Sequence, residues 1–159
     1  MKDKKKVLLV NGSRTPIGSF GRSLKSVTVD KLAQHAMVQA LRRSGVAPNQ
    51  VDSVILGHAF QSSLTPNLAR FAWDKAGLPV HVDAHTVQIQ CGSGMLAIDQ
   101  GVDKIVLGQS DIVVAGGAAA SGPDALPNAV LANLINVALG NVGKTVLLSR
   151  ATAPAASGF

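Results

Sequence analysis

The chain has few aromatic residues and almost no cysteine. Of its 159 residues only 3% are aromatic and none is tyrosine, so the stacking surfaces that bind single-stranded nucleic acid are scarce. The one cysteine, Cys91, excludes an intramolecular disulfide, and no cysteine and histidine residues have the spacing of zinc ligands. We therefore expect no metal site, no nucleic-acid partner and a reducing compartment, the cytoplasm.

Long apolar runs are also absent. No segment reaches the roughly 20 consecutive apolar residues that a membrane-spanning helix needs. The first apolar run, residues 7–10, is too short for the core of a signal peptide. These absences predict a soluble protein with no membrane partner.

Acidic residues are outnumbered by basic ones. Nine acidic residues stand against fifteen basic residues, which gives a formal net charge of +6. Four of these cations lie close together at the start of the chain and form a solvated tail: Lys2, Lys4, Lys5 and Lys6. The remaining excess is small and suits either solubility or an anionic ligand.

Apolar residues and glycines dominate what is present. Hydrophobic residues make up 47% of the sequence and charged residues 15%, which excludes a disordered chain. Apolar runs of strand length alternate with segments of helical period, and this alternation predicts one α/β domain, a layered sandwich with a largely parallel sheet, over residues 1–150. A loose tail should follow at residues 151–159. The expected strands are residues 7–10, 51–56, 85–90, 111–115 and 144–148, and the expected helices are residues 28–44, 67–76, 92–107 and 128–139.

Cys91 lies where a predicted strand gives way to a predicted helix, in the run Gln90-Cys91-Gly92-Ser93-Gly94. A thiol at a helix N-terminus feels the positive end of the helix dipole, which favours the nucleophilic thiolate. Gly92 and Gly94 would let a substrate approach the backbone closely. From these residues alone, a reactive thiol and a buried inert cysteine both remain open.

Five segments in order resemble the N-terminal half of the thiolase family. They are the loop at residues 14–21, the strand and histidine at residues 54–58, the helix and turn at residues 67–79, the run Cys91-Gly92-Ser93-Gly94 and the strand with its glycine pair at residues 113–117. Residues 145–149 are similar to the family's fifth strand, which runs antiparallel to the others. The resemblance therefore implies a mixed, mostly parallel five-stranded sheet.

The resemblance also implies a function, that of an acyl-CoA acyltransferase without a cofactor. In this family a cysteine thiolate attacks an acyl-CoA thioester and passes the acyl group to a second acyl-CoA. By this resemblance Cys91 is the nucleophile, coenzyme A thioesters are the substrates, and the backbone at Gly92 and Gly94 lies near the oxyanion. A ketoacyl synthase is a weaker alternative because the opening Arg14-Thr15-Pro16 loop is more similar to thiolases.

Several features of the family are missing from the sequence, which predicts a catalytically incomplete domain. A histidine between glycine and proline, a second cysteine and the long insertion after the glycine pair have no counterpart, and Gln88 replaces the usual Asn, Ser or Thr. His58 is the one histidine that we consider as a general base. The alternative function is a non-enzymatic, truncated or engineered half that serves as a structural module.

Self-association is the last expectation. A lone half should expose the outer face of the helix at residues 92–107 and the edge of the strand at residues 85–90. We therefore expect a homodimer. The alternative is a monomer, because Asp99, Gln100, Asp103 and Lys104 interrupt the apolar surface of the helix and would solubilise it.

Overall fold

The computed structural model describes residues 6–19 and 21–117 of the chain, in which helices and strands alternate. The elements are α1 (Val29–Ser44), the short 3-10 helix η1 (Pro48–Gln50), β1 (Ser53–Gly57), α2 (Leu68–Lys75), β2 (Asp83–Val87), α3 (Ser93–Val106) and β3 (Val113–Gly117). The chain therefore has the α/β architecture that the alternation predicts.

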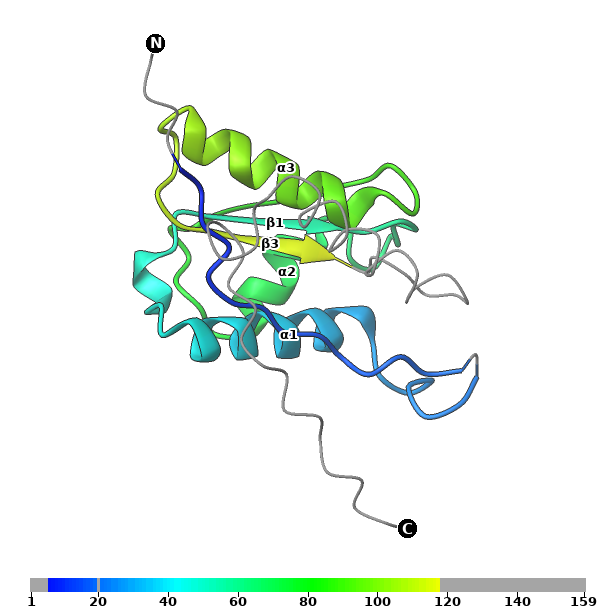
Figure 1. Cartoon of the computed structure of the whole chain (residues 1–159). Coiled ribbons are helices and arrows are strands. Elements are labelled where there is room, and N and C mark those ends of the chain that lie inside the picture. The colour runs from blue at the N-terminus through cyan, green and yellow to red at the C-terminus, as the bar shows by residue number, and fades with distance from the viewer. Residues whose placement is uncertain (1–5, 20, 118–159) are drawn as a thin grey trace.

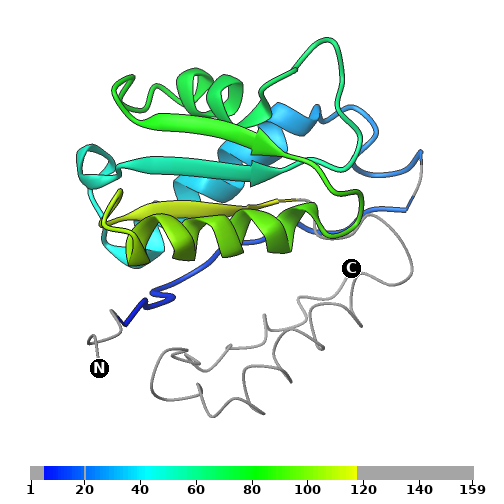
Figure 2. The ribbon, with the colours of Figure 1, turned by 90° about the horizontal axis from the view of Figure 1, so that it is seen from above.

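The three strands of the described part form one parallel sheet in the order β2-β1-β3. Figure 2 shows them side by side with their arrowheads pointing the same way. In register, Gly57 at the end of β1 lies between Val87 of β2 and Gly117 of β3. The carboxyl ends of all three strands thus meet at one edge of the sheet.

Helices cover both faces of this sheet (Figure 1). α3 packs on β1 and β3 from one side, whereas α2 packs on β2 and β1 from the other and α1 packs on α2. An ion pair at 3.3 Å between Lys75 and the buried Asp30 joins α2 to α1. The result is a layered sandwich whose hydrophobic core lies between the sheet and the α1–α2 pair.

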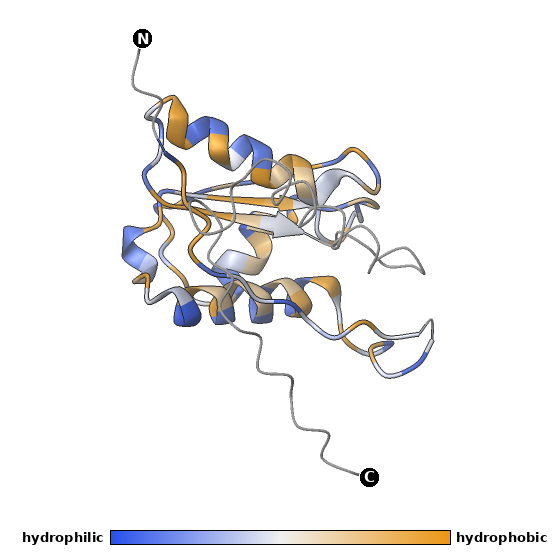
Figure 3. Ribbon diagram, in the orientation of Figure 1, coloured by the Kyte–Doolittle hydropathy of each residue, from blue (hydrophilic) through white to orange (hydrophobic). Residues whose placement is uncertain are grey.

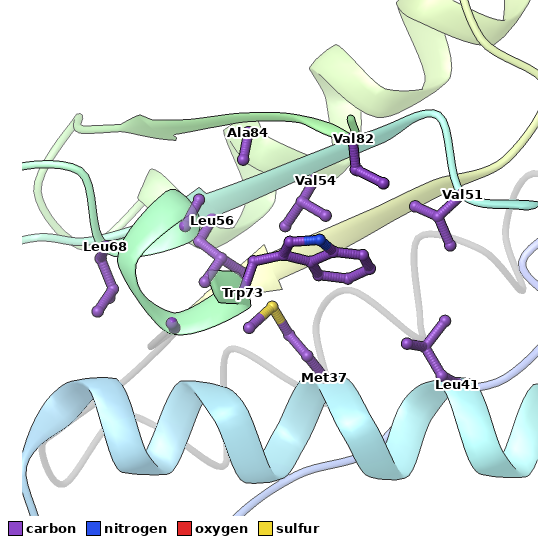
Figure 4. Packing of buried hydrophobic residues seen from close by; sticks show 11 residues of the cluster. Met37, Leu41, Val51, Val54, Leu56, Leu68, Trp73, Val82 and Ala84 are labelled. Carbon is purple, nitrogen blue, oxygen red and sulfur yellow. The ribbon is translucent and has the colours of Figure 1, made fainter. Parts of the chain in front are cut away.

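Trp73 of α2 is the largest side chain of this core and is fully buried. Figure 4 shows its indole ring between Val54 of the sheet and Met37 of α1. Its Nε1 donates to the carbonyl of Pro79 at 2.8 Å, so the one polar atom of the ring is satisfied. Figure 3 shows apolar residues on β1 and on the turns of α1 that face the sheet, with hydrophilic residues on the outer turns.

The helix boundaries follow from local signals in the sequence. α1 ends where Gly45 adopts a left-handed conformation with φ of 69°, as its glycine predicts. α2 begins at its N-cap Asn67, whose side chain accepts a hydrogen bond from the amide of Arg70 at 3.3 Å.

The expected strands differ from the structure in their bounds or in their burial, and β1 and β3 each begin two residues later than predicted. Residues 7–10 do not join the β2-β1-β3 sheet, although Leu9 forms a β-bridge. Leu8, Leu9 and Val10 are each at least 50% exposed, so the predicted burial of this segment is wrong. Four adjacent apolar residues favour burial but name no partner strand. β2 begins at Asp83 and ends at Val87, two to three residues earlier than predicted. The helix at residues 128–139, the strand at 144–148 and the tail at 151–159 lie outside the described residues.

Candidate nucleophile site

Cys91 lies at the carboxyl edge of the sheet, in the turn between β2 and α3. The residue is exposed, and α3 begins two residues later at Ser93. The structure therefore agrees with the expected position at a helix start and excludes a buried cysteine. Of the two readings that the sequence leaves open, the geometry favours the accessible thiol.

The residue before Cys91 has an unusual backbone. Gln90 has φ of 53°, and it is the one non-glycine residue with positive φ in the described chain. The left-handed conformation costs an ordinary residue about 1–2 kcal/mol, so neighbouring contacts must hold it. Ser93 supplies two such contacts: its Oγ accepts from the amide of Ile89 at 2.9 Å and donates to the carbonyl of Gln90 at 2.6 Å.

The start of α3 also rests directly on the sheet. A Cβ atom added to Gly57 would lie 2.2 Å from the carbonyl carbon of Ser93 and 2.4 Å from the amide nitrogen of Gly94. Only glycine allows this contact, since real Cβ atoms essentially never come within 3.0 Å of such atoms. The end of β1 thus fixes the height of the first turn of α3 above the sheet.

Gly92 and Gly94 have separate places in this turn. The amide of Gly92 donates to the carbonyl of Ile89 at 3.2 Å, and a Cβ there would meet the Ile89 side chain at 2.9 Å. Gly94 is buried, and its close backbone contact is with Gly57. Gly92 therefore allows tight packing of the turn itself, whereas the contact at Gly94 depends on the missing side chain of Gly57.

Two further hydrogen bonds tie the Cys91 turn to the loop that follows β1. The amide of His58 donates to the carbonyl of Val87 at 3.0 Å and extends the pairing of β1 with β2. Gln88 Nε2 donates to the carbonyl of Ala59 at 2.8 Å. Gln88, which departs from the pattern of the resembled family, therefore links the two loops at this edge.

His58 is buried, and its Nδ1 has no hydrogen-bond partner among the described residues. Burial lowers the pKa of its imidazole below the ordinary value of 6.5, which favours the neutral ring. Strand alternation places His58 on the sheet face of Val54 and Leu56, which α1 and α2 cover, whereas Gly57 faces α3. This geometry does not bring the imidazole to the face of the sheet that Ser93 touches.

A second group of charged side chains lies at the opposite end of the sheet, where the strands begin. Lys104 Nζ donates to the Asp83 carboxylate at 2.6 Å and to the buried Ser53 hydroxyl at 3.0 Å, at the amino ends of β2 and β1. The hydrogen bond from Lys104 holds the pKa of the Asp83 carboxyl below its ordinary value. The Asp52 carboxylate, just before β1, accepts from two backbone amides, which likewise lower its pKa. These carboxylates therefore stabilise the fold at the edge away from Cys91.

The outer edge of β2 is partly covered by α2. Asp83 donates its amide to Asp52, so Asp83, His85 and Val87 face β1 and the intervening residues face outward. The outward carbonyls of Val82 and Ala84 accept hydrogen bonds from Arg70 and Asn67 of α2. Little of this edge remains for pairing with another strand.

Residues 6–19 and 21–117 contain neither a metal-binding cluster nor a membrane-spanning helix. No three histidine, cysteine, aspartate or glutamate side chains gather there in a way that would hold a metal ion. No helix in that part is both long enough and apolar enough to cross a membrane.

The fold and this site define an α/β domain with an accessible cysteine between a parallel sheet and a helix. The family model described as the thiolase N-terminal domain matches residues 7–122. The chain therefore belongs to the thiolase family and corresponds to its N-terminal domain.

This chain spans less than a third of the length of the relatives that it matches. It is 39% identical over 127 residues to an acetyl-CoA acetyltransferase of Syntrophomonas wolfei, which covers 79% of this chain and 32% of that protein. It is 41% identical over 111 residues to an acetyl-CoA acetyltransferase of Cupriavidus necator, or 70% of this chain and 28% of that protein. The crystal structure of the Bacillus anthracis acetyl-CoA acetyltransferase superimposes with a TM-score of 0.69 at 46% identity, covering 70% of this chain and 28% of that one.

Sequence reasoning identified Cys91 but gave no role to Ser93, Gln90 or Gly57. Ser93 lies two residues after Cys91 in the Cys-Gly-Ser-Gly run, and this position could have indicated a role beside the cysteine. The left-handed conformation of Gln90 had no signal, since residue type favours glycine or asparagine there. The contact of Gly57 with α3 is a tertiary feature that no local pattern encodes.

Proposed function

We propose that this chain is the acyl-accepting part of a thiolase and that Cys91 is its nucleophile. The observation that carries the proposal is the exposed Cys91 at the carboxyl edge of a parallel sheet, two residues before α3. Ligands of open α/β sheets bind at this edge. The relatives that match most of the described residues are acetyl-CoA acetyltransferases, and this similarity supports an acyl-CoA substrate.

The proposed step is an acyl transfer to sulfur. The Cys91 thiolate attacks the carbonyl carbon of the acyl-CoA thioester and forms a tetrahedral intermediate. When this intermediate collapses, the new bond from acyl carbon to Cys91 Sγ remains and the bond to the coenzyme A sulfur breaks. Coenzyme A leaves as a thiolate that takes a proton from solvent. No cofactor takes part.

We propose further that this chain alone stops after acyl transfer to Cys91. Carbon–carbon bond formation needs a base to deprotonate the second acyl-CoA. The sequence has one cysteine, and none of its four histidines stands between glycine and proline as in the resembled family. His58 does not supply this base, because it is buried on the face of the sheet away from α3.

Intact mass spectrometry after incubation with acetyl-CoA tests both statements. We expect one acetyl group on the wild-type chain, none on Cys91→Ser, and no release of acetoacetyl-CoA from either. No adduct on the folded wild type at saturating acetyl-CoA would refute the nucleophile, and acetoacetyl-CoA production would refute the incomplete cycle.

We also propose a second function, a self-associating module that forms a homodimer through the outer face of α3. Met95 in the first turn of this helix is 52% exposed, and Val106 and the C-cap Leu107 at its other end are 48% and 70% exposed, with the exposed Asp99 and Asp103 between the two ends. Exposed apolar side chains at both ends of one helix favour a protein partner. Pairing through the edge of β2 is less favourable because Arg70 and Asn67 already occupy its outward carbonyls.

Light scattering coupled to size-exclusion chromatography tests the dimer. We expect twice the chain mass for the wild type and a shift toward one chain mass for Leu107→Glu. Leu64→Glu is the matched control, since Leu64 is exposed but lies on the loop after β1. One chain mass for the wild type across a wide concentration range would refute the dimer.

A further inference from the structure

Ser93 is the one fully buried polar side chain next to Cys91. Its relative exposure is 0%, and its hydroxyl takes part in two hydrogen bonds of 2.9 and 2.6 Å. Both partners, the amide of Ile89 and the carbonyl of Gln90, belong to the backbone just before Cys91. A buried hydroxyl is used here to hold a segment that is otherwise exposed.

This hydroxyl does not cap the helix. A serine that caps a helix bonds forward, to an amide of the first turn. Ser93 is instead the first residue of α3, the N-cap position belongs to Gly92, and that cap has no side-chain hydrogen bond. The Ser93 hydroxyl bonds backward, and it therefore stabilises the turn and not the helix end.

The two bonds flank the left-handed residue Gln90. A non-glycine residue with positive φ persists when the surrounding contacts define its conformation. Without them Gln90 would relax toward the ordinary regions of backbone space and would turn the next peptide. The next residue is Cys91, so the direction of its side chain depends on the Ser93 bonds.

We propose that Ser93 is a positioning residue: through its bonds to Ile89 and Gln90 it holds the Cys91 thiol at the N-terminus of α3. Gly57 supports the same arrangement from the sheet, because its missing side chain lets the Ser93 backbone lie against β1. This inference rests on the proposed nucleophile, but it concerns the orientation of the thiol and can be tested without coenzyme A.

The test is the second-order rate of Cys91 alkylation by iodoacetamide, measured from pH 6 to 10. Loss of the Ser93 hydroxyl in Ser93→Ala should slow alkylation near neutral pH by about two- to fivefold, the size of one helix-dipole interaction. Ser53→Ala is the matched control, because Ser53 is also 0% exposed and hydrogen-bonded but lies at the opposite end of β1. Its alkylation rate should equal that of the wild type, and Ser93→Thr, which keeps the hydroxyl, should restore the rate.

Hydrogen exchange of the wild-type chain provides a measurement that needs no variant. The amide of Ile89 should exchange at least tenfold more slowly than that of Gln88, although both residues are exposed. Equal exchange of these two amides, or equal alkylation of folded Ser93→Ala and the wild type, would overturn the positioning role. An absent acetyl adduct combined with slowed alkylation of Ser93→Ala would refute the proposed function and leave the positioning role standing.

Discussion

The contact between Gly57 and α3 makes a sharp prediction, because one methyl group should disturb the whole candidate site. In Gly57→Ala the new Cβ would lie 2.2 Å from the carbonyl carbon of Ser93, whereas ordinary contact begins near 3.4 Å. The start of α3 must therefore recede by about 1 Å. The opposing atoms belong to the backbone, so no side chain can rotate out of the way.

The expected cost is at the upper end of that for overpacked cores, about 3 kcal/mol. With a urea m-value of about 2 kcal/mol/M, the midpoint of unfolding should fall by about 1.5 M. Trp73, the single tryptophan and fully buried, makes fluorescence a direct probe of this transition. Alkylation of Cys91 should change in the same variant, since the helix start moves with it.

Two other glycines supply a graded control. A Cβ on Gly101 of α3 would meet the side chains of Val113 and Ala115 at 3.2 and 3.4 Å, which can yield by a few tenths of an ångström. Alanine also gains up to about 1 kcal/mol over glycine within a helix, so Gly101→Ala should be close to neutral. Gly12→Ala meets nothing within 4 Å and should not lower the midpoint. A midpoint for Gly57→Ala equal to that of Gly12→Ala would refute the close contact.

Three further predictions concern polar groups. Asn67→Ala removes the N-cap of α2 and the oxygen that accepts the Thr86 hydroxyl at 2.9 Å. Urea unfolding should therefore show a loss of about 2–3 kcal/mol in the free energy of unfolding. Asn49→Ala, at an exposed position, is the control and should cost less than about 0.5 kcal/mol. The folded-state pKa of His58 lies below 6.5, so the unfolded chain binds a proton first as the pH falls, and stability should be lost below about pH 6.5. His58→Phe should remove that loss. If the stability of His58→Phe had the same pH dependence as that of the wild type, this would contradict the burial of His58. The pKa of Asp52 is likewise lowered, so its contribution is present above about pH 4 and lost at more acid pH, and Asp52→Asn should flatten that acid limb.

The alternation of apolar runs and helical periods was enough to predict most of the fold. α1, α2 and α3 begin and end within two residues of the predicted bounds, because glycines and the Asn67 cap mark these ends. β2 begins earlier than the apolar pattern predicts, because the polar residue Asp83 joins the strand through the hydrogen bond from its amide to the carbonyl of Asp52. Residues 7–10 are exposed although they are apolar, because an apolar run does not by itself specify which element will cover it.

The candidate site was predictable only where chemistry is visible in single residues. Cys91 has a reactive sulfur atom and glycines beside it, so the sequence alone identifies it as a candidate site residue. The residues that orient it act through tertiary contacts: Ser93 through bonds to backbone before it, and Gly57 through the absence of a side chain. In the sequence, this serine and this glycine look the same as the many serines in turns and glycines at strand ends that orient no other residue.

The glycines at the strand ends help to explain how close Cys91 lies to the carboxyl ends of the strands. Gly57 and Gly117 are paired in register, and a Cβ on Gly117 would lie 2.5 Å from the carbonyl oxygen of Gly57. Neighbouring strand ends without side chains leave α3 free to rest its first turn on the backbone of β1. A larger residue at Gly57 would lift that turn, and the Ser93 bonds would then hold Cys91 at a different height above the sheet. The position of Cys91 therefore depends on the end of β1 and on one buried hydroxyl together, so changes at Gly57 and Ser93 should not be additive in their effect on Cys91 alkylation.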